Sequence, residues 1–229
     1  MTDVEKKIFI IIPAYNEHHC IREVVASLLT QDLNHIVIID DGSTVPLADL
    51  LKDLSVTYLR HAVNLGQGAA LQTGFNYAQS NCADIVVTFD ADGQHDPKDI
   101  PNLLHPLLMN EADVALGSRF LGPNKDIPAF KKMILHIARL INFLFSGLLL
   151  SDAHNGLRAF GVTALERIRL TENRMAHASE ILFEIKRSNL RYKEVPVHIS
   201  YSPYSRQKGQ NSWDSIQILF DLILHKLFR

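Results

Sequence analysis

Short runs of apolar, mostly β-branched residues recur through the first half of the chain, and every run stops at a polar or glycine-rich loop. They lie at 8–12, 35–39, 56–59, 85–89 and 114–116. Continuous apolar runs of this length are typical of strands buried on both faces, as in parallel sheets covered by helices. Segments with helical spacing separate the runs. The alternation therefore predicts an α/β fold with a mostly parallel, Rossmann-like central sheet and helices on both faces.

The helical segments are expected at 17–29, 69–79 and 97–109. Asp96 precedes Pro97, and an acidic N-cap followed by proline at the first helical position marks the start of the third segment. The second half of the chain is less regular. There we expect a helix at 131–149, an irregular loop at 151–156, a helix at 176–187, a strand at 192–199 and a final helix after a polar loop.

The composition is that of one ordinary globular domain. Its 229 residues are 47% hydrophobic and 21% charged, which excludes intrinsic disorder and fibrous proteins. Because 23 basic residues oppose 25 acidic ones, the net charge of -2 gives no general attraction for nucleic acid, and we expect no nucleic-acid partner. The start of the chain lacks the pattern of a signal peptide, and polar residues interrupt the apolar stretch 133–150. We therefore expect a cytoplasmic protein without a membrane-spanning helix.

Oxygen-bearing side chains gather directly after the fourth apolar run. Asp90 and Asp92 flank a single alanine, and Gln94 follows. Carboxylate and amide oxygens suit Mg²⁺ or Mn²⁺ and leave coordination positions for water and a substrate diphosphate. Because aspartate and glycine are also the commonest turn residues, the string is equally compatible with a simple turn at a strand end. Ligands of parallel sheets bind outside the carboxyl ends of the strands, which favours a site here.

Five strings follow the expected strands in order, and as a set they are specific. They are Ile-Ile-Ile-Pro-Ala-Tyr-Asn-Glu at 10–17, Asp-Asp-Gly-Ser at 40–43, Asn-Leu-Gly-Gln-Gly at 64–68, Asp-Ala-Asp-Gly-Gln-His at 90–95 and Gly-Ser-Arg at 117–119. The series resembles the family 2 glycosyltransferases with the GT-A fold, most closely the dolichyl-phosphate mannose synthase and polyprenyl-phosphate branch. The resemblance covers nearly the whole chain, strongly through residue 119. It implies a single GT-A domain, with a nucleotide-sugar-binding half at 1–120 and an acceptor-binding half with amphipathic helices at 121–229.

The resemblance assigns roles to individual residues. It implies that Asp90, Asp92 and Gln94 hold the Mg²⁺ or Mn²⁺ ion. Because His95 follows Gln94, we expect it to orient this site rather than to bind the metal, or to contact the acceptor. The resemblance also implies that Asp41 accepts a hydrogen bond from the base. The residues implied to bind the nucleotide sugar are Pro13, Tyr15, Glu17, Asp41, Gly66, Asp90, Ala91, Arg119, Arg206 and Lys208.

The later segments resemble the family more loosely. The segment 152–160 is similar to one that shapes the sugar and acceptor pocket in the family. In the polar loop at 206–212, Asn211 and Ser212 stand where Ser and Lys are usual, which leaves Arg206 and Lys208 as the candidate cations. Arg119, whose planar guanidinium suits phosphate oxygens, is implied to clamp the donor diphosphate, although it is also compatible with a surface ion pair.

The activity implied is an inverting transfer of a sugar from a GDP- or UDP-sugar, with Asp92 and Arg119 as catalytic residues. A polyprenyl phosphate, dolichyl or undecaprenyl, is the preferred acceptor, because a phosphate monoester is already an anion at pH 7 and needs no general base. Glu180 is the candidate base for the alternative, transfer to a saccharide hydroxyl in cell-surface polysaccharide synthesis. It is equally compatible with an exposed helix carboxylate.

Two other classes of protein are further alternatives. A nucleotidyltransferase usually carries a glycine- and lysine-rich phosphate loop near its start, and residues 13–17 contain no Gly, Lys or Arg. A non-catalytic nucleotide-binding protein would not need the complete set of Asp90, Asp92 and Arg119.

Two amphipathic stretches bear on how the protein meets a lipid acceptor. Each has a wide apolar stripe with basic residues nearby, which suits a helix lying on a membrane surface without crossing it. Packing on the sheet or a homodimer interface explains such stripes equally well. The stripes are Ile134, Ile137, Ile141, Leu144, Phe145 and Leu148, and Ile216, Leu219, Phe220, Ile223, Leu224 and Leu227. We expect peripheral attachment to the cytoplasmic membrane face.

Overall fold

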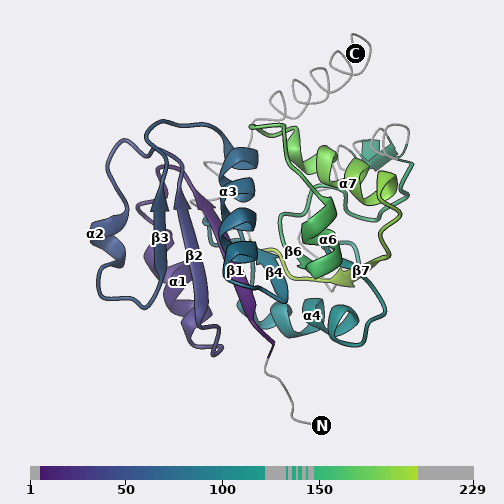
Figure 1. Ribbon diagram of the computed structural model, residues 1–229, viewed down its shortest axis with the longest axis horizontal. Coiled ribbons are helices and arrows are strands. Elements are labelled where there is room, and N and C mark those ends of the chain that lie inside the picture. Colours follow the sequence, from purple (N-terminus) through teal and green to yellow (C-terminus); the bar gives the residue numbers. More distant parts are fainter. Residues whose placement is uncertain are drawn as a thin grey trace.

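The computed structural model describes residues 6–121, 133, 136–137, 139–140, 143 and 147–200. Within this part of the chain a seven-stranded sheet has the order β3-β2-β1-β4-β6-β5-β7 (Figure 1). Its strands are β1 (Ile8–Ala14), β2 (His35–Asp40), β3 (Thr57–Arg60), β4 (Ile85–Thr88), β5 (Val114–Ser118), β6 (Arg158–Gly161) and β7 (Tyr192–Pro196). Every pairing is parallel except those of β6, which runs antiparallel to both β4 and β5. The expected mostly parallel sheet is confirmed.

The helices connect the strands much as the sequence predicts. Asp96 accepts a hydrogen bond from the backbone N–H of Lys98, so the predicted N-cap is confirmed. The first helix begins at Ile21, later than the predicted residue 17, because residues 17–20 form a turn that leads into it. The helical elements are α1 (Ile21–Leu29), α2 (Ala48–Leu51), α3 (Gln67–Ser80), η1 (Pro97–Asp99), α4 (Ile100–Leu108), α6 (Val162–Arg167) and α7 (His177–Arg187).

Two of the predicted helices are described only in part or not at all. Residues 133, 136–137, 139–140 and 143 are helical, in agreement with the helix predicted at 131–149, but residues 147–149 are not helical, so the predicted end of that helix is wrong. Gly147 has a φ of 70°, a backbone conformation that does not continue an α-helix. The remainder of that helix up to residue 146 and the final helix lie outside the described residues. None of the helices in the described ranges has the length and apolar character needed to cross a membrane.

Helices cover the sheet on both faces, because the buried strands present apolar side chains alternately to each side. Phe9 and Ile11 of β1 belong to a core closed by α3, α6 and α7. Ile10 and Ile12 belong to the opposite core, closed by α1 and α4. Figure 1 shows α3 and α6 in front of the sheet and α1 behind it. The predicted layer arrangement is therefore confirmed.

Three short elements were not predicted: α2, α6 and β6. Strand β6 starts with Arg158, whose side chain is buried, and spans only Arg158–Gly161. A short strand that opens with a charged residue lacks the apolar run by which strands are recognised. Its antiparallel direction matters for the site, since its amino end lies at the carboxyl ends of β4 and β5. Strand β7 ends at Pro196 and not at the predicted residue 199.

Candidate active site

The strand order creates a topological switch point. From β1 the chain continues to β2 and β3 on one side, and it returns to β4 on the other side of β1. Loops leaving β1 and β4 therefore diverge, and in open α/β sheets ligands bind at this point. Residues 15–17 follow β1, and residues 89–94 follow β4. Tyr15 and Glu17, predicted to bind the nucleotide, and Asp90, Asp92 and Gln94, predicted to bind the metal, thus flank the switch point.

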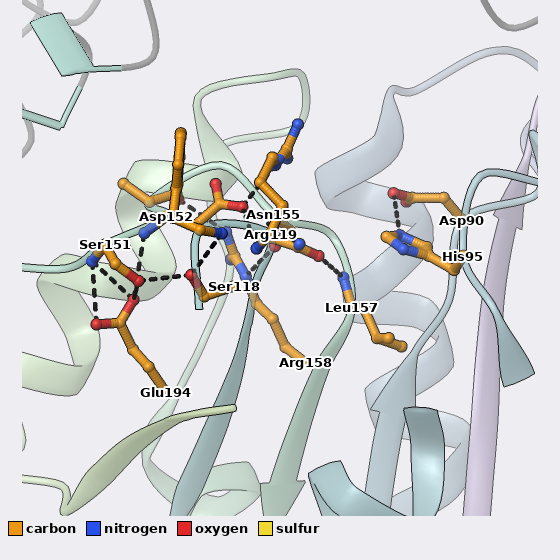
Figure 2. A network of polar contacts seen from close by, with 12 residues as sticks. Asp90, His95, Ser118, Arg119, Ser151, Asp152, Asn155, Leu157, Arg158 and Glu194 are labelled. Atoms are coloured by element: carbon orange, nitrogen blue, oxygen red, sulfur yellow. Dashed lines mark hydrogen bonds and ion pairs between the residues drawn. The ribbon is translucent and has the colours of Figure 1, made fainter. Parts of the chain in front are cut away.

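Asp90 is held by donors from two other parts of the chain. Gln67 Nε2 donates to its Oδ1 at 3.2 Å. His95 Nε2 donates to its Oδ2 at 2.9 Å (Figure 2). His95 is buried and packs edge-on against Phe89. Burial raises the pKa of Asp90, but the hydrogen bond and charge of His95, with two further basic side chains, outweigh it and lower the pKa overall. Asp90 is therefore a fixed and ionised carboxylate.

Asp92 lies in a different environment. Its Oδ1 accepts from the backbone N–H of Gln94 at 3.0 Å, and its Oδ2 accepts from Gln94 Nε2 at 2.6 Å. Ala91, between the two carboxylates in sequence, is buried. Burial and the neighbouring negative charges of Asp90 and Glu17 raise the pKa of Asp92. A positive charge beside this carboxylate would relieve both effects.

This donor set fits a divalent cation. Asp90 and Asp92 supply two carboxylates, and no group of three or more His, Cys, Asp or Glu side chains in the described part of the chain assembles a metal cage. A hard cation held by two carboxylates keeps positions for water and for a substrate diphosphate. Gln94 presents its Nε2 donor to Asp92, so its role as a metal ligand through Oε1 stays a prediction.

Asp40, the first of the two aspartates after β2, has a structural role. It is fully buried and accepts hydrogen bonds from Ser43 N, Leu47 N and the Tyr58 hydroxyl. Burial and the hydrogen bond to Asp40 raise the pKa of Tyr58 to about 12. Asp40 thus shapes the loop that follows β2 and presents the next residue, Asp41.

Asp41 joins the loops that follow β2 and β3. Its Oδ1 accepts from Leu65 N at 2.9 Å and its Oδ2 from Gly66 N at 2.7 Å. His61 Nδ1 lies 2.7 Å from Oδ1, and His61 Nε2 lies 2.9 Å from Thr73 Oγ1. An ionised carboxylate has about four acceptor positions, so three protein donors leave one for a base. That Asp41 contacts a base stays a prediction.

The segment after β1 carries the other residues predicted to line the nucleotide pocket. Pro13 is buried within the strand, and Tyr15 is 45% exposed. Asn16 has a φ of 58° and donates its backbone N–H to Ser43 Oγ, which ties this segment to the loop after β2. Glu17 is partly buried and close enough to Asp92 to affect its pKa.

Gly66 is confined on two sides. Besides donating to Asp41, it has a φ of 108°, and a Cβ there would lie 2.2 Å from the carbonyl oxygen of Asn173. The same carbonyl accepts from Gly68 N at 2.9 Å and from Ala69 N at 3.3 Å. Two backbone donors at the amino end of α3 are therefore satisfied by the second half of the chain.

Glu180 secures the turn that caps α3. Its carboxylate accepts from Thr171 N, from Thr171 Oγ1 and from Glu172 N, at distances between 2.5 and 3.1 Å. No described contact joins it to Asp90 or Asp92. A role for Glu180 as a base stays a prediction, and the structure gives its carboxylate a different set of partners.

Arg119 pairs with a buried carboxylate. Its Nε donates to Asp152 Oδ2 at 2.6 Å, and its backbone N–H donates to the same oxygen at 3.1 Å (Figure 2). The Arg119 side chain is 11% exposed and that of Asp152 is 1% exposed. Asp152 is therefore buried and Arg119 is largely covered, so the pair differs from the surface ion pair that the sequence left open.

The segment 151–157 connects Arg119 to Asp90. It enters the site because β6 runs antiparallel between β4 and β5. Its Asp152 end holds Arg119, while at its other end a Cβ on Gly156 would lie 2.1 Å from Asp90 Oδ2. The buried guanidinium of Arg158 fastens the segment through the carbonyl oxygens of Ala153 and Asn155. Burial lowers the pKa of Arg158 to about 10.

Sequence reasoning missed two residues that bond directly to predicted ones. Gln67 lies within the string 64–68 but was given no role, although its side chain reaches Asp90. His61 had no signal in the sequence, because its contact with Asp41 depends on two loops meeting in space. Arg206 and Lys208 lie outside the described residues.

Comparisons with known proteins agree with this geometry. The family model described as "Glycosyl transferase family 2" matches residues 9–169. An uncharacterized protein of Methanocaldococcus jannaschii is 37% identical over 97% of this chain and 93% of its own length. UDP-N-acetylglucosamine--dolichyl-phosphate N-acetylglucosaminyltransferase of Methanococcus voltae is 34% identical over 97% of both chains. Undecaprenyl-phosphate mannosyltransferase of Micrococcus luteus is 29% identical over 83% of this chain and 82% of its own.

Among solved structures, glucosyl-3-phosphoglycerate synthase from Mycobacterium tuberculosis, in complex with Mn²⁺ and UDP-glucose, matches with a TM-score of 0.69. The match has 20% sequence identity and covers 95% of this chain and 79% of that chain. At this level of identity the likeness concerns the fold alone. It confirms the expected GT-A type of fold.

Proposed function

Because this chain belongs to glycosyltransferase family 2, we propose that it moves a sugar from a nucleotide-diphosphate sugar to a polyprenyl phosphate with inversion at the sugar C1. The observation that carries the proposal is one local arrangement. Two neighbouring carboxylates, Asp90 and Asp92, lie beside the switch point, and a bound cation would offset the burial and negative charge around Asp92. The segment 151–157 connects these carboxylates to the ion pair of Arg119 and Asp152. Such a site suits a diphosphate whose negative charge grows as its bond to the sugar breaks.

Donor binding divides between two sides of the site. We assign the base to the loops after β1, β2 and β3, where Tyr15 is exposed and Asp41 joins two loops. We assign the diphosphate to Asp90, Asp92, Gln94 and Arg119. A divalent ion bound there supplies charge neutralisation for the diphosphate. Arg119 stabilises the leaving nucleotide with hydrogen bonds that strengthen as charge develops.

A phosphate acceptor is consistent with the hydrogen bonds that the Glu180 carboxylate accepts. An acceptor hydroxyl needs a base, whereas a phosphate monoester at pH 7 attacks as an anion. The carboxylate of Glu180 already accepts hydrogen bonds from the backbone N–H groups of Thr171 and Glu172. The names of two relatives, which include dolichyl phosphate and undecaprenyl phosphate, support the same acceptor class.

An exposed apolar stripe supports contact with the membrane that holds such an acceptor. Among the described helical residues between 133 and 143, four large apolar side chains are 39% to 58% exposed. Their spacing places them along one side of a helix, as in helices that lie in a membrane surface. They are Met133, Ile137, Leu140 and Phe143. Of the stripe predicted from the sequence, Ile137 belongs to this set, whereas Leu148 is buried in the core and does not fit a membrane-facing stripe. The other predicted members lie outside the described residues.

The proposal is tested by sugar transfer to a short-chain polyprenyl phosphate. Purified protein with Mn²⁺ is given UDP-N-acetylglucosamine, UDP-glucose or GDP-mannose, and glycolipid and released nucleotide diphosphate are measured. We expect stoichiometric formation of both products with one donor, and none with EDTA. Nucleotide binding without transfer to any lipid phosphate would favour the non-catalytic alternative, and transfer only to saccharides would contradict the acceptor.

The variant Glu180→Gln separates the two acceptor classes. It keeps the size of the side chain and removes its basicity, so transfer to a polyprenyl phosphate should fall by less than about tenfold. The steady-state rate at saturating donor is the measurement, and nucleotide affinity serves as the control for folding. A rate loss of roughly 10³-fold with unchanged nucleotide affinity would instead identify Glu180 as a base acting on a hydroxyl.

A further inference from the structure

Glu194 of β7 is a carboxylate that neither the sequence motifs nor the predicted site includes. It lies beneath the start of the segment 151–157 (Figure 2). Its Oε1 accepts from Ser151 N at 2.7 Å, from Ser151 Oγ at 2.6 Å and from Asp152 N at 3.2 Å. Its Oε2 accepts from Ser151 N at 3.0 Å. Within the described chain Glu194 forms no ion pair, so its charge is directed at these donors.

Two routes lead from Glu194 to Arg119. In the first, Glu194 fixes the backbone of Asp152, and the Asp152 carboxylate binds the backbone N–H and the Nε of Arg119. In the second, the Ser151 hydroxyl, which bonds to Glu194, lies 2.5 Å from Ser118 Oγ. Ser118 immediately precedes Arg119 in the chain. Its Oγ accepts a hydrogen bond from the backbone N–H of Phe120, the residue after Arg119.

The direction of the guanidinium depends on this arrangement. The Nε–H of Arg119 donates to Asp152, so Arg119 would bind a phosphate through its Nη groups. The guanidinium is planar, so the position of Asp152 sets the direction of these groups. A charged hydrogen-bond acceptor holding two consecutive backbone N–H groups fixes the turn that carries Asp152 more firmly than a neutral one.

We propose that Glu194 is a positioning residue for sugar transfer: it orients Arg119 toward the donor diphosphate through Ser151 and Asp152. The inference rests on the proposed function, because it takes the diphosphate as the group that Arg119 meets. Glu194 itself touches neither substrate nor metal ligand. Through Glu194, a strand late in the chain would affect the nucleotide side of the site. Strand β7 comes about forty residues after the segment 151–157 and pairs with β5, which ends next to Arg119.

A double-mutant cycle tests the proposal. The variants are Glu194→Gln, Arg119→Ala and the two combined, with Glu111→Gln as a matched control. Glu111 is an exposed carboxylate that also bonds to β7, through Lys193, and it has no contact with the segment 151–157. For each variant the affinity for UDP and for GDP with Mn²⁺ is measured by calorimetry, together with kcat, donor KM and the midpoint of thermal unfolding.

We expect Arg119→Ala to lower kcat by roughly 10²-fold and Glu194→Gln by roughly tenfold, because small misplacements of a charge-stabilising donor are costly. In the Arg119→Ala background, Glu194→Gln should change neither kcat nor nucleotide affinity by more than about twofold, since residues that act through one group are not additive. Glu111→Gln should match the wild type in all measurements.

Other outcomes overturn the inference. Equal losses from Glu194→Gln with and without Arg119 would show that Glu194 acts elsewhere. A lowered unfolding midpoint with unchanged kcat and affinity would make Glu194 structural only. If Arg119→Ala has wild-type kcat and affinity, no route through Arg119 exists. Failure of the proposed function looks different, because the wild type itself would then transfer no sugar to a polyprenyl phosphate, whether or not it binds UDP or GDP.

Discussion

At the scale of single residues, Asp90 and Asp92 differ in what balances their charge. Asp90 receives hydrogen bonds from Gln67 and His95, and its pKa is lowered. Asp92 receives bonds only from its near neighbour Gln94 among the described contacts, and burial with the charge of Asp90 raises its pKa. A bound cation therefore changes the environment of Asp92 more than that of Asp90.

The variant Asp92→Ala is expected to abolish metal-dependent nucleotide binding while leaving the fold intact, because a loop carboxylate contributes little to the core. Calorimetry with UDP or GDP, with Mn²⁺ and with EDTA, is the measurement. Asp53→Ala is the control, since Asp53 is an exposed carboxylate paired with Arg22. Wild-type affinity in Mn²⁺ and no effect of EDTA on either protein would refute the assignment of the metal.

His154 makes the stability of the segment 151–157 depend on pH. Burial, followed by the positive charges of Arg158 and Arg119, lowers the pKa of His154 to about 4. An unfolded histidine titrates near 6.5, so the unfolded chain binds a proton first as the pH falls. The contribution of His154 to the free energy of unfolding is therefore fully present above pH ~6.5, and it is lost progressively as the pH falls from there to pH ~4.

The variant His154→Gln should remove this part of the pH dependence. We expect the free energy of unfolding to fall less between pH 7 and pH 4.5 in the variant than in the wild type, because carboxylates that titrate in this range are common to both. Urea unfolding at a series of pH values measures the difference. Parallel curves for the two proteins would mean that His154 titrates normally in the folded protein.

The residues of the site could be predicted from the sequence where they belong to a short motif that directly follows a strand. Asp90, Asp92 and Arg119 each follow a strand within a short motif, so the sequence singles them out. Glu194 reaches Ser151 across 43 positions of the chain, and its surrounding sequence reads as an ordinary strand. A contact of this kind is created by the fold and leaves no pattern in the sequence.

At the scale of secondary-structure elements, predictability followed the apolar or β-branched runs in the sequence and not burial alone. Strands β1, β2, β4 and β5 are almost wholly buried, so their apolar runs were recognised. Strand β6 is also buried, yet it is four residues long and begins with Arg158. The sequence thus identified the strands that build the sheet and missed the one that brings the segment 151–157 between Asp90 and Arg119.

Gly156→Ala tests the contact between this segment and Asp90. A Cβ at residue 156 would lie 2.1 Å from the Asp90 carboxylate, so the variant must displace one of them. We expect metal-dependent nucleotide affinity to fall by at least about tenfold, since a small shift of a ligand is costly. Gly161→Ala is the control, because a Cβ there meets its nearest atom at 3.5 Å. Wild-type affinity in Gly156→Ala would contradict this account of the contact.

At the scale of the whole molecule, one sheet unites the two parts of the chain. The nucleotide loops follow β1, β2 and β3, whereas Glu194 and the segment 151–157 belong to the later part of the chain. Strand β6 pairs with β4 on one side and with β5 on the other. Under the proposed function, the sheet therefore joins the donor and acceptor regions, and a lipid acceptor would approach this shared edge from the membrane.

The approach to the membrane is tested through the exposed stripe of Met133, Ile137, Leu140 and Phe143. We expect the protein to sediment with liposomes that contain anionic lipid, because exposed apolar side chains on one side of a helix insert at the interface. The double variant Ile137→Glu and Leu140→Glu should lose at least about tenfold in partitioning, since it places two charges where the stripe meets the acyl chains. Leu108→Glu is the matched control, because Leu108 is a similarly exposed leucine at the end of α4.

The enzymatic consequence separates membrane docking from a general loss of function. The double variant should transfer sugar normally to a short, detergent-soluble polyprenyl phosphate and poorly to the same acceptor chemistry with a long chain held in liposomes. Because nucleotide binding does not involve the stripe, its affinity should be unchanged. A wild-type protein that stays entirely in the supernatant at low salt would refute peripheral attachment, and it would strengthen the case for a saccharide acceptor.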